Sequence, residues 1–170
     1  MPVSGAFSVI ASIGESLDTP ENHNGVITNF IRQAYDVTDG AGAGDINLVW
    51  SDRRTVAAGA TDTLDLNGGG LLDVFGNAAN FATVKGICIF NRETVAATHR
   101  IDFAPAAANP FLWTFNAAAD RVEIAPSSAY MQWDDSGKAT VAGGSDAIRI
   151  INTDGANTVT YDIIVIGLTT

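Results

Sequence analysis

Hydrophobic and polar residues alternate with a period of two along most of this chain, a pattern typical of β-strands that bury one face. The alternation is clearest at residues 61–66, which read Thr, Asp, Thr, Leu, Asp, Leu. Similar patterns predict roughly nine to eleven short strands, at residues 7–13, 26–38, 46–56, 61–66, 81–90, 98–103, 111–115, 121–125, 129–134, 147–153 and 159–168.

Two segments also carry a helical pattern. Four apolar residues of segment 26–38 recur at helical spacing, but its β-branched content and the preceding Asn-His-Asn-Gly turn favour a strand. Residues 71–77 are expected to form one short helical turn, because Leu71, Leu72 and Phe75 would share a helical face before Gly76.

Short strands at intervals of about ten to fifteen residues, without intervening helices, indicate an antiparallel sandwich or barrel. Within residues 81–90, Val84, Cys88 and Phe90 are expected to share one face, and residues 152–157 read as a hairpin connection. The chain has no internal repeat. We therefore expect one all-β domain spanning residues 1–170, with residues 1–4 as a short flexible arm.

The composition points away from several classes of function. The chain has 170 residues, of which 46% are hydrophobic and only 16% are charged, so a folded core is expected and an oligomer that hides neutral surface is favoured over a monomer. The formal net charge is −10. Because an acidic surface repels phosphate groups, we expect neither nucleic-acid binding nor binding to anionic membranes.

The single cysteine, Cys88, excludes a disulfide within the chain and a cage of thiolate ligands. It lies in an apolar run and is expected to act as a small buried hydrophobe. The first sixteen residues do not read as a secretory signal, and no apolar run has the length of a membrane span. We expect the chain to be made and folded in a cytosol.

Candidate catalytic and metal-binding residues are few. The histidines, His23 and His99, are far apart and belong to no metal-binding or catalytic motif. Two pairs of aspartates, Asp134/Asp135 and Asp62/Asp65, can supply oxygen ligands to Ca²⁺. Neither pair matches a calcium-binding loop, and such aspartates are common in turns. The sequence therefore predicts a protein that is not an enzyme, with no catalytic residue, no cofactor and no bound metal.

Aromatic and basic residues offer candidates for contacts. Trp113, Tyr130 and Trp133 lie close enough in sequence for a shallow carbohydrate platform, although core filling or subunit contact is the favoured interpretation. Arg53 and Arg54 either pair with an acidic neighbour in an assembly or form a solvated strand edge that resists aggregation.

Several segments resemble a family of small phage and prophage virion structural proteins. The resemblance covers about residues 46–168 and consists of strand and turn patterns. It is carried by the segments LVWSD at 48–52, TDTLDL at 61–66, LDVFGN at 72–77, FATVKGI at 81–87, VEIAP at 122–126 and YDIIVIG at 161–167.

The resemblance implies a jelly-roll-like β-sandwich in the virion, made in the bacterial host cytoplasm. It implies a capsid decoration, or cement, protein that forms a homotrimer on the lattice of the major capsid protein and stabilises the head. A structural module of the tail, baseplate or head fibre, with carbohydrate binding at the host surface, is the alternative.

Overall fold

The computed structural model describes residues 5–17, 25–73, 75–94 and 99–169, with side chains from residue 36 onward. These residues form eleven β-strands and no helix. The N-terminal segment 1–4, which was predicted to be flexible, lies outside the described residues. The strands are β1 Gly5–Leu17, β2 Gly25–Asp39, β3 Asp45–Ile46, β4 Leu48–Val56, β5 Thr61–Asp65, β6 Phe81–Asn91, β7 Ile101–Pro105, β8 Val122–Ile124, β9 Ala129–Ala139, β10 Ala147–Asn152 and β11 Val159–Thr169.

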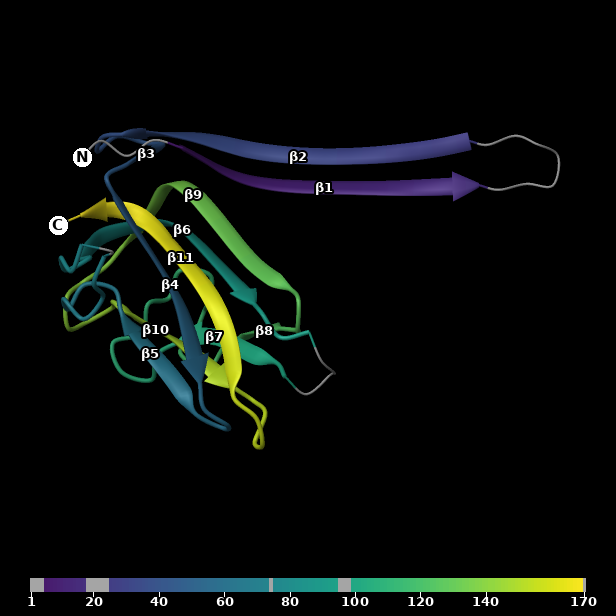
Figure 1. Ribbon diagram of the computed structural model, residues 1–170. Helices are drawn as coiled ribbons and strands as arrows, with labels where there is room; N and C mark the ends of the chain where they lie inside the picture. Colours follow the sequence, from purple (N-terminus) through teal and green to yellow (C-terminus); the bar gives the residue numbers. More distant parts are fainter. Residues whose placement is uncertain (1–4, 18–24, 74, 95–98, 170) are drawn as a thin grey trace.

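Eight of the strands form two antiparallel sheets packed face to face (Figure 1). The β4 sheet has the order β4-β11-β6-β9, and the β5 sheet has the order β5-β10-β7-β8. The first four of these strands pair with the last four in reverse order: β4 with β11, β5 with β10, β6 with β9 and β7 with β8. This nested pairing is the topology of a jelly roll, in which one long hairpin folds over itself. The predicted all-β, jelly-roll-like sandwich is therefore confirmed.

The main hydrophobic core fills the space between the two sheets. Phe81, Ile89 and Tyr161 of the β4 sheet and Leu64 and Ile148 of the β5 sheet are all at most 1% exposed. Because alternate residues of each strand point to the same face, the period-two pattern of the sequence delivers these side chains to one interior. Burial of each such side chain contributes about 1.5–3 kcal/mol, so this core dominates the stability of the sandwich.

The first two strands form a long hairpin, here called the arm. β1 pairs antiparallel with β2 from Gly5 opposite Val37 to Leu17 opposite Gly25. The prediction of a strand, rather than a helix, for residues 26–38 is confirmed. Figure 1 shows the arm running well beyond the end of the sandwich, to which it is joined through β3.

A second, smaller hydrophobic cluster joins the root of the arm to the β4 sheet. Val37 and Ile46 are 5% and 2% exposed and pack with Ile166 of β11 on the side of the sheet that faces away from the main core. Beside them, the amino group of Lys85, a residue that is 2% exposed, donates hydrogen bonds to the carbonyl oxygens of Gly42 at 2.6 Å and Asp45 at 2.8 Å. Apolar packing and the hydrogen bonds of the buried Lys85 side chain thus hold the root of the arm on the β4 sheet.

The expected helical turn at residues 71–77 is wrong. Leu72 instead forms an isolated antiparallel bridge with Ala78, and the Asp73 carboxylate accepts the backbone N–H groups of Phe75 and Asn77, each at 2.8 Å. Gly76 has a φ of +83°, a conformation that glycine adopts without strain. The aspartate side chain therefore offers the backbone a turn that competes with a helix.

The expected strand at residues 111–115 is also wrong, since this segment is irregular. Phe111 and Phe115 are nevertheless buried in the main core, and the Phe111 N–H donates to the carbonyl of Ala147 at 2.9 Å. Farther along, the Asp120 carboxylate accepts the N–H groups of Asn116 and Ala117. Local side-chain bonds thus replace a strand ladder in this segment.

Three finer expectations about strands need correction. A bulge between Val84 and Gly86 reverses the alternation in β6, so Val84 faces the core whereas Cys88 and Phe90 face outward, and Cys88 is only half-buried. The strand β9 continues to Ala139, beyond the expected end of the strand at residue 134. The connection at residues 152–157 is not a hairpin, because β10 and β11 belong to different sheets.

Candidate functional site

The outer face of the β4 sheet is the first of three candidate regions. It is defined by the apolar residues that point away from the main core: Val49 on β4, Ile164 and Ile166 on β11, Cys88 on β6, and Met131 and Trp133 on β9. The strand register places them in two adjacent rows, Val49-Ile166-Gly86-Trp133 and Ser51-Ile164-Cys88-Met131.

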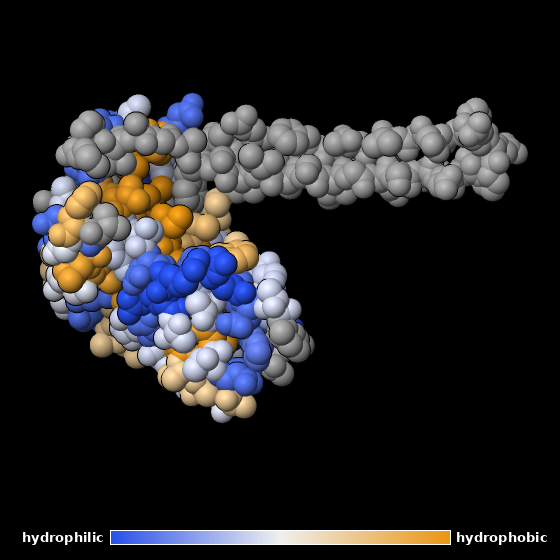
Figure 2. Space-filling view, viewed as in Figure 1, coloured by the Kyte–Doolittle hydropathy of each residue, from blue (hydrophilic) through white to orange (hydrophobic). Residues whose placement is uncertain are grey.

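This outer face is unusually apolar for a sheet that faces solvent. Ile164 is 41% exposed and Val49 is 39% exposed, whereas the solvent side of an antiparallel sheet is commonly polar. Gly86 keeps the surface flat, because a Cβ atom there would come within 2.6 Å of Ile166 and 3.1 Å of Trp133. In Figure 2, hydrophobic surface gathers on the sandwich just below the root of the arm. The face has the character of a contact surface.

Charged residues at the open edge between β4 and β5 form the second region. The Asp62 carboxylate accepts hydrogen bonds from Arg54 Nε at 2.6 Å, from Arg54 Nη2 at 3.1 Å and from the hydroxyl of Tyr161 at 2.8 Å. Burial and the neighbouring carboxylate of Asp62 raise the pKa of Tyr161, and hydrogen bonding to Asp62 raises the pKa of Arg54. This group links the edges of the two sheets.

The predicted contact residues Arg53 and Arg54 are both paired within the chain. Arg53 Nε donates to Asp162 at 2.7 Å, Arg92 donates to the same carboxylate at 2.8 Å, and Arg54 also reaches Asp52 at 3.0 Å. An open hollow of about 310 Å³ beside them is lined by residues 52–57 and 60–62. The two arginines in this lining are matched by two aspartates, so a charged ligand would have to displace existing ion pairs.

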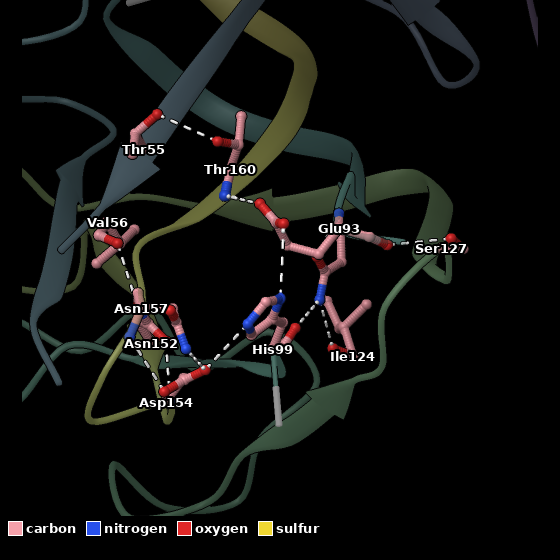
Figure 3. Close-up of polar contacts among 11 residues, drawn as sticks. Thr55, Val56, Glu93, His99, Ile124, Ser127, Asn152, Asp154, Asn157 and Thr160 are labelled. Carbon is pink, nitrogen blue, oxygen red and sulfur yellow. Dashed lines mark hydrogen bonds and ion pairs between the residues drawn. The ribbon is translucent and has the colours of Figure 1, made fainter. Parts of the chain in front are cut away.

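His99 is the centre of the third region (Figure 3). Its Nε2 lies 3.3 Å from Asp154 Oδ2 and its Nδ1 lies 3.7 Å from Glu93 Oε2. Glu93 also accepts the backbone N–H of Thr160 at 2.8 Å. Hydrogen bonds from the backbone of Ala156 and the side chain of Asn157 hold the pKa of Asp154 below its usual range. The network therefore ties the segment after β6 to the connection between β10 and β11.

The chemistry open to this His99 network is limited by its geometry. Both ring nitrogens face carboxylates, so neither is directed at a hydroxyl or thiol that it could activate as a base. The two nitrogens also point in opposite directions, so a single metal ion cannot bind both. The arrangement suits a structural link between the two segments that carry Glu93 and Asp154.

Buried amides support the same loops from within. Asn152 is 1% exposed, and its side-chain N–H groups donate to the carbonyl oxygens of Val56, Ala57 and Asn157 at 2.8–3.1 Å. Asn91 is fully buried and donates to the carbonyls of His99 and Ile124. These bonds satisfy backbone groups that the loops leave without strand partners.

The three aromatic residues suggested for a carbohydrate platform do not lie on one surface. Trp113 and Tyr130 pack against the main core, where the Tyr130 ring lies 5.1 Å from that of Phe103. Trp133 packs against the smaller cluster on the outer face, and its indole N–H donates to Asp135 at 2.7 Å. The structure thus places Trp133 at the outer face and the other two on the opposite side of the sheet.

The aspartates considered for Ca²⁺ are engaged in local bonds. Asp134 accepts the N–H of Ser136 at 2.9 Å, and Asp65 accepts the N–H of Asn67 at 3.0 Å. In the part of the chain that the structure describes, no cluster of three or more His, Cys, Asp or Glu side chains could hold a metal ion. The same part contains no helix long and apolar enough to cross a membrane. His23 lies outside the described residues.

Sequence reasoning missed two features. The burial of Lys85 was not predicted, although a lysine inside an apolar strand was a visible signal. The outer face was also missed, in part because the bulge in β6 turns Cys88 toward it and away from the face that holds Val84.

Comparison with known proteins adds little to these observations. No protein-family model and no curated protein matches the chain. One similar solved structure is described as "Bacillus endospore appendages form a novel family of disulfide-linked pili"; it shares 12% identity, with a TM-score of 0.34, over 78% of this chain and 97% of that chain. A TM-score this low has no bearing on function.

Proposed function

We propose that this chain is a non-enzymatic structural protein of a bacteriophage particle, a capsid decoration protein that assembles as a trimer on the lattice of the major capsid protein. The observation that carries the proposal is the arm, a two-stranded hairpin that extends beyond the sandwich to which its root is fixed (Figure 1). A two-stranded hairpin is marginally stable by itself, so an arm of this length needs a neighbouring molecule.

The sandwich is well suited to be one subunit of a repetitive protein lattice. Its charged groups at the open edge are paired within the chain, and its outer face offers apolar rather than charged contacts. Weak contacts that repeat over a symmetric lattice add up to high avidity. The resemblance of residues 46–168 to phage virion proteins directs the proposal to a phage particle, since a jelly roll alone does not specify a function.

Particles produced with and without this protein test the proposal. We expect particles that lack it to lose resistance to heat or chelators, and we expect complete particles to carry hundreds of copies. A copy number of three, six or twelve would instead favour the tail, baseplate or head-fibre alternative. Equal robustness of the two kinds of particle would refute decoration.

A further inference from the structure

The outer face of the β4 sheet is only partly covered by its own chain. Val37 and Ile46 cover Ile166 at the root of the arm, while Ile164 in the adjacent row and Val49 beside Ile166 stay about 40% exposed. The contact at the root shows that this face accepts apolar side chains of neighbouring strands, one of which, Val37, belongs to the arm.

The register of the arm places more apolar residues on the face that carries Val37. Val37 lies opposite Gly5 and Tyr35 lies opposite Phe7, so these positions share one face of the hairpin. Continuing with a period of two, the same face holds the apolar positions Val9, Ala11, Ile13, Leu17, Ile31 and Ile27 and the polar positions Glu15, Asn29 and Gln33. The other face is more polar: it holds Ser8, Ser12, Ser16, Thr28, Arg32 and Asp36 beside the apolar positions Ala6, Ile10, Val26, Phe30 and Ala34.

The reach of the arm determines which molecule this apolar face can meet. At about 3.4 Å per residue, the thirteen residues of β1 extend over roughly 44 Å. A compact sandwich of this size has a radius of gyration of roughly 14 Å, which corresponds to a diameter of roughly 36 Å, so the arm is longer than the body that supports it. The far half of the arm projects past its own sandwich (Figure 1).

We infer that the arm of one copy docks, through the face that carries Val37, on the outer face of the β4 sheet of a second copy. Every copy then supplies one arm and receives one, which is a head-to-tail contact that closes into a ring when the rotation permits. The docked hairpin gains the apolar cover that an isolated hairpin lacks, and the exposed Ile164 and Val49 become buried.

A basic protein or a membrane is a poorer occupant for this surface. The two rows contain no charged residue, and the adjacent row holds Asp162, which is already paired with Arg53 and Arg92. The net charge of −10 opposes contact with anionic lipids. A mostly apolar strand face, on which Glu15 is a charged position, is the complement that the chain itself provides. The inference rests on the proposed function only in requiring more than one copy.

Chemical crosslinking between two distinguishable copies tests the contact. One copy carries Ala11→Cys together with Cys88→Ser, so its only thiol is on the arm, and the other is the wild-type chain, whose only thiol is Cys88 on the outer face. The copies are co-expressed, treated with a short bis-maleimide and digested for mass spectrometry. A link between position 11 and Cys88 can then form only between copies.

The matched control replaces Ser12, the next residue, which lies on the other face of the arm. We expect the Ala11→Cys variant to give several-fold more crosslink to Cys88 than the Ser12→Cys variant made in the same Cys88→Ser background. Equal yields would overturn the inference. A further variant carries Ala11→Cys and retains Cys88. If this variant forms the link between positions 11 and 88 only within single chains, the inference is also overturned.

A second variant removes the apolar contact without touching the core. Ile164→Asp is expected to raise the dissociation constant of the assembly at least about tenfold in sedimentation velocity, while Val141→Asp, at a 59% exposed apolar residue outside the outer face, leaves it unchanged. Circular dichroism checks that both variants fold. If the wild type assembles and Ile164→Asp assembles equally well, the inference fails but the proposed function stands; a wild type that stays monomeric at every concentration refutes both.

Discussion

Replacement of Asp62 by alanine should weaken the sandwich where the edges of its two sheets meet. The change removes the acceptor of three hydrogen bonds, two from Arg54 and one from the hydroxyl of Tyr161. The Tyr161 residue is fully buried, so its hydroxyl cannot turn to water for a new partner.

The size of the effect follows from the environment of each donor. A buried hydroxyl without a partner costs about 1–3 kcal/mol. The Arg54 side chain is 32% exposed and keeps its ion pair with Asp52 at 3.0 Å. Removal of its ion pair with Asp62 therefore lowers the free energy of unfolding by about 1 kcal/mol or less. We expect Asp62→Ala to reduce the free energy of unfolding by about 1–4 kcal/mol, which corresponds to roughly 2–16 °C in Tm.

A double-mutant cycle makes this reasoning refutable. Tyr161→Phe alone should cost about 1–2 kcal/mol, because Asp62 keeps both bonds from Arg54. Once the hydroxyl is gone, Asp62→Ala no longer orphans it, so the double variant should be more stable than the sum of the single changes predicts, by about 1–2 kcal/mol.

Urea unfolding followed by tryptophan fluorescence, to which the buried Trp50 contributes, measures each variant. Asp162→Ala is the matched control, because it removes a carboxylate that pairs with the well-exposed Arg53 and Arg92, and it should cost at most about 1 kcal/mol. The account would be refuted if the effects of Asp62→Ala and Tyr161→Phe on the free energy of unfolding were additive. It would also be refuted if Asp62→Ala lowered this free energy no more than Asp162→Ala does.

Three further changes test other parts of the fold. Gly167→Ala should lower the free energy of unfolding by about 3 kcal/mol or more, because the added Cβ would overlap the backbone carbonyl of Thr83 in β6. Gly155→Ala, whose Cβ would point into open space, should change this free energy little, and thermal unfolding compares the two variants. Asn152→Asp should lower Tm more than Asn152→Ala, since it turns a carboxylate toward three carbonyl oxygens; equal losses would contradict this. A titration of stability should show losses at both ends of the pH range. Asp154 has a pKa below its unfolded value near 4, so its contribution is complete above about pH 4 and is lost as the pH falls. Tyr161 has a pKa above its unfolded value near 10, so its contribution is complete below about pH 10 and is lost as the pH rises, and Tyr161→Phe should reduce that alkaline loss.

Most strands could be predicted because their signal is local. The alternation at residues 61–66 and 159–168 places apolar residues on one face, and the structure shows strands at Thr61–Asp65 and Val159–Thr169. Segment 111–115 misled the prediction because Phe111 and Phe115 are buried without being in a strand. A period of two reports burial on alternate positions, and an irregular segment that closes the end of a core can produce the same pattern.

The candidate regions were predicted less well than the strands. Arg53 and Arg54 were proposed either as contact residues in an assembly or as a solvated strand edge, and their partners within the chain, Asp162 and Asp62, became known only from the folded chain. The outer face escaped prediction since the bulge after Val84 moves Cys88 outward. Such a shift of one residue reverses every following side chain of a strand, and nothing in the local sequence marks it clearly.

Taken alone, the amino-acid pattern determined that this chain forms an all-β fold with a buried apolar interior, because alternation within a strand depends only on neighbouring residues. Tertiary structure decided which strands pair, so residues 152–157 cross between sheets instead of closing a hairpin. It also decided that the first two strands leave the sandwich as an arm while Lys85 and Val37 fix its root. Pairing and docking join residues that are far apart in the chain, and their free energy depends on long-range geometry that no local pattern contains.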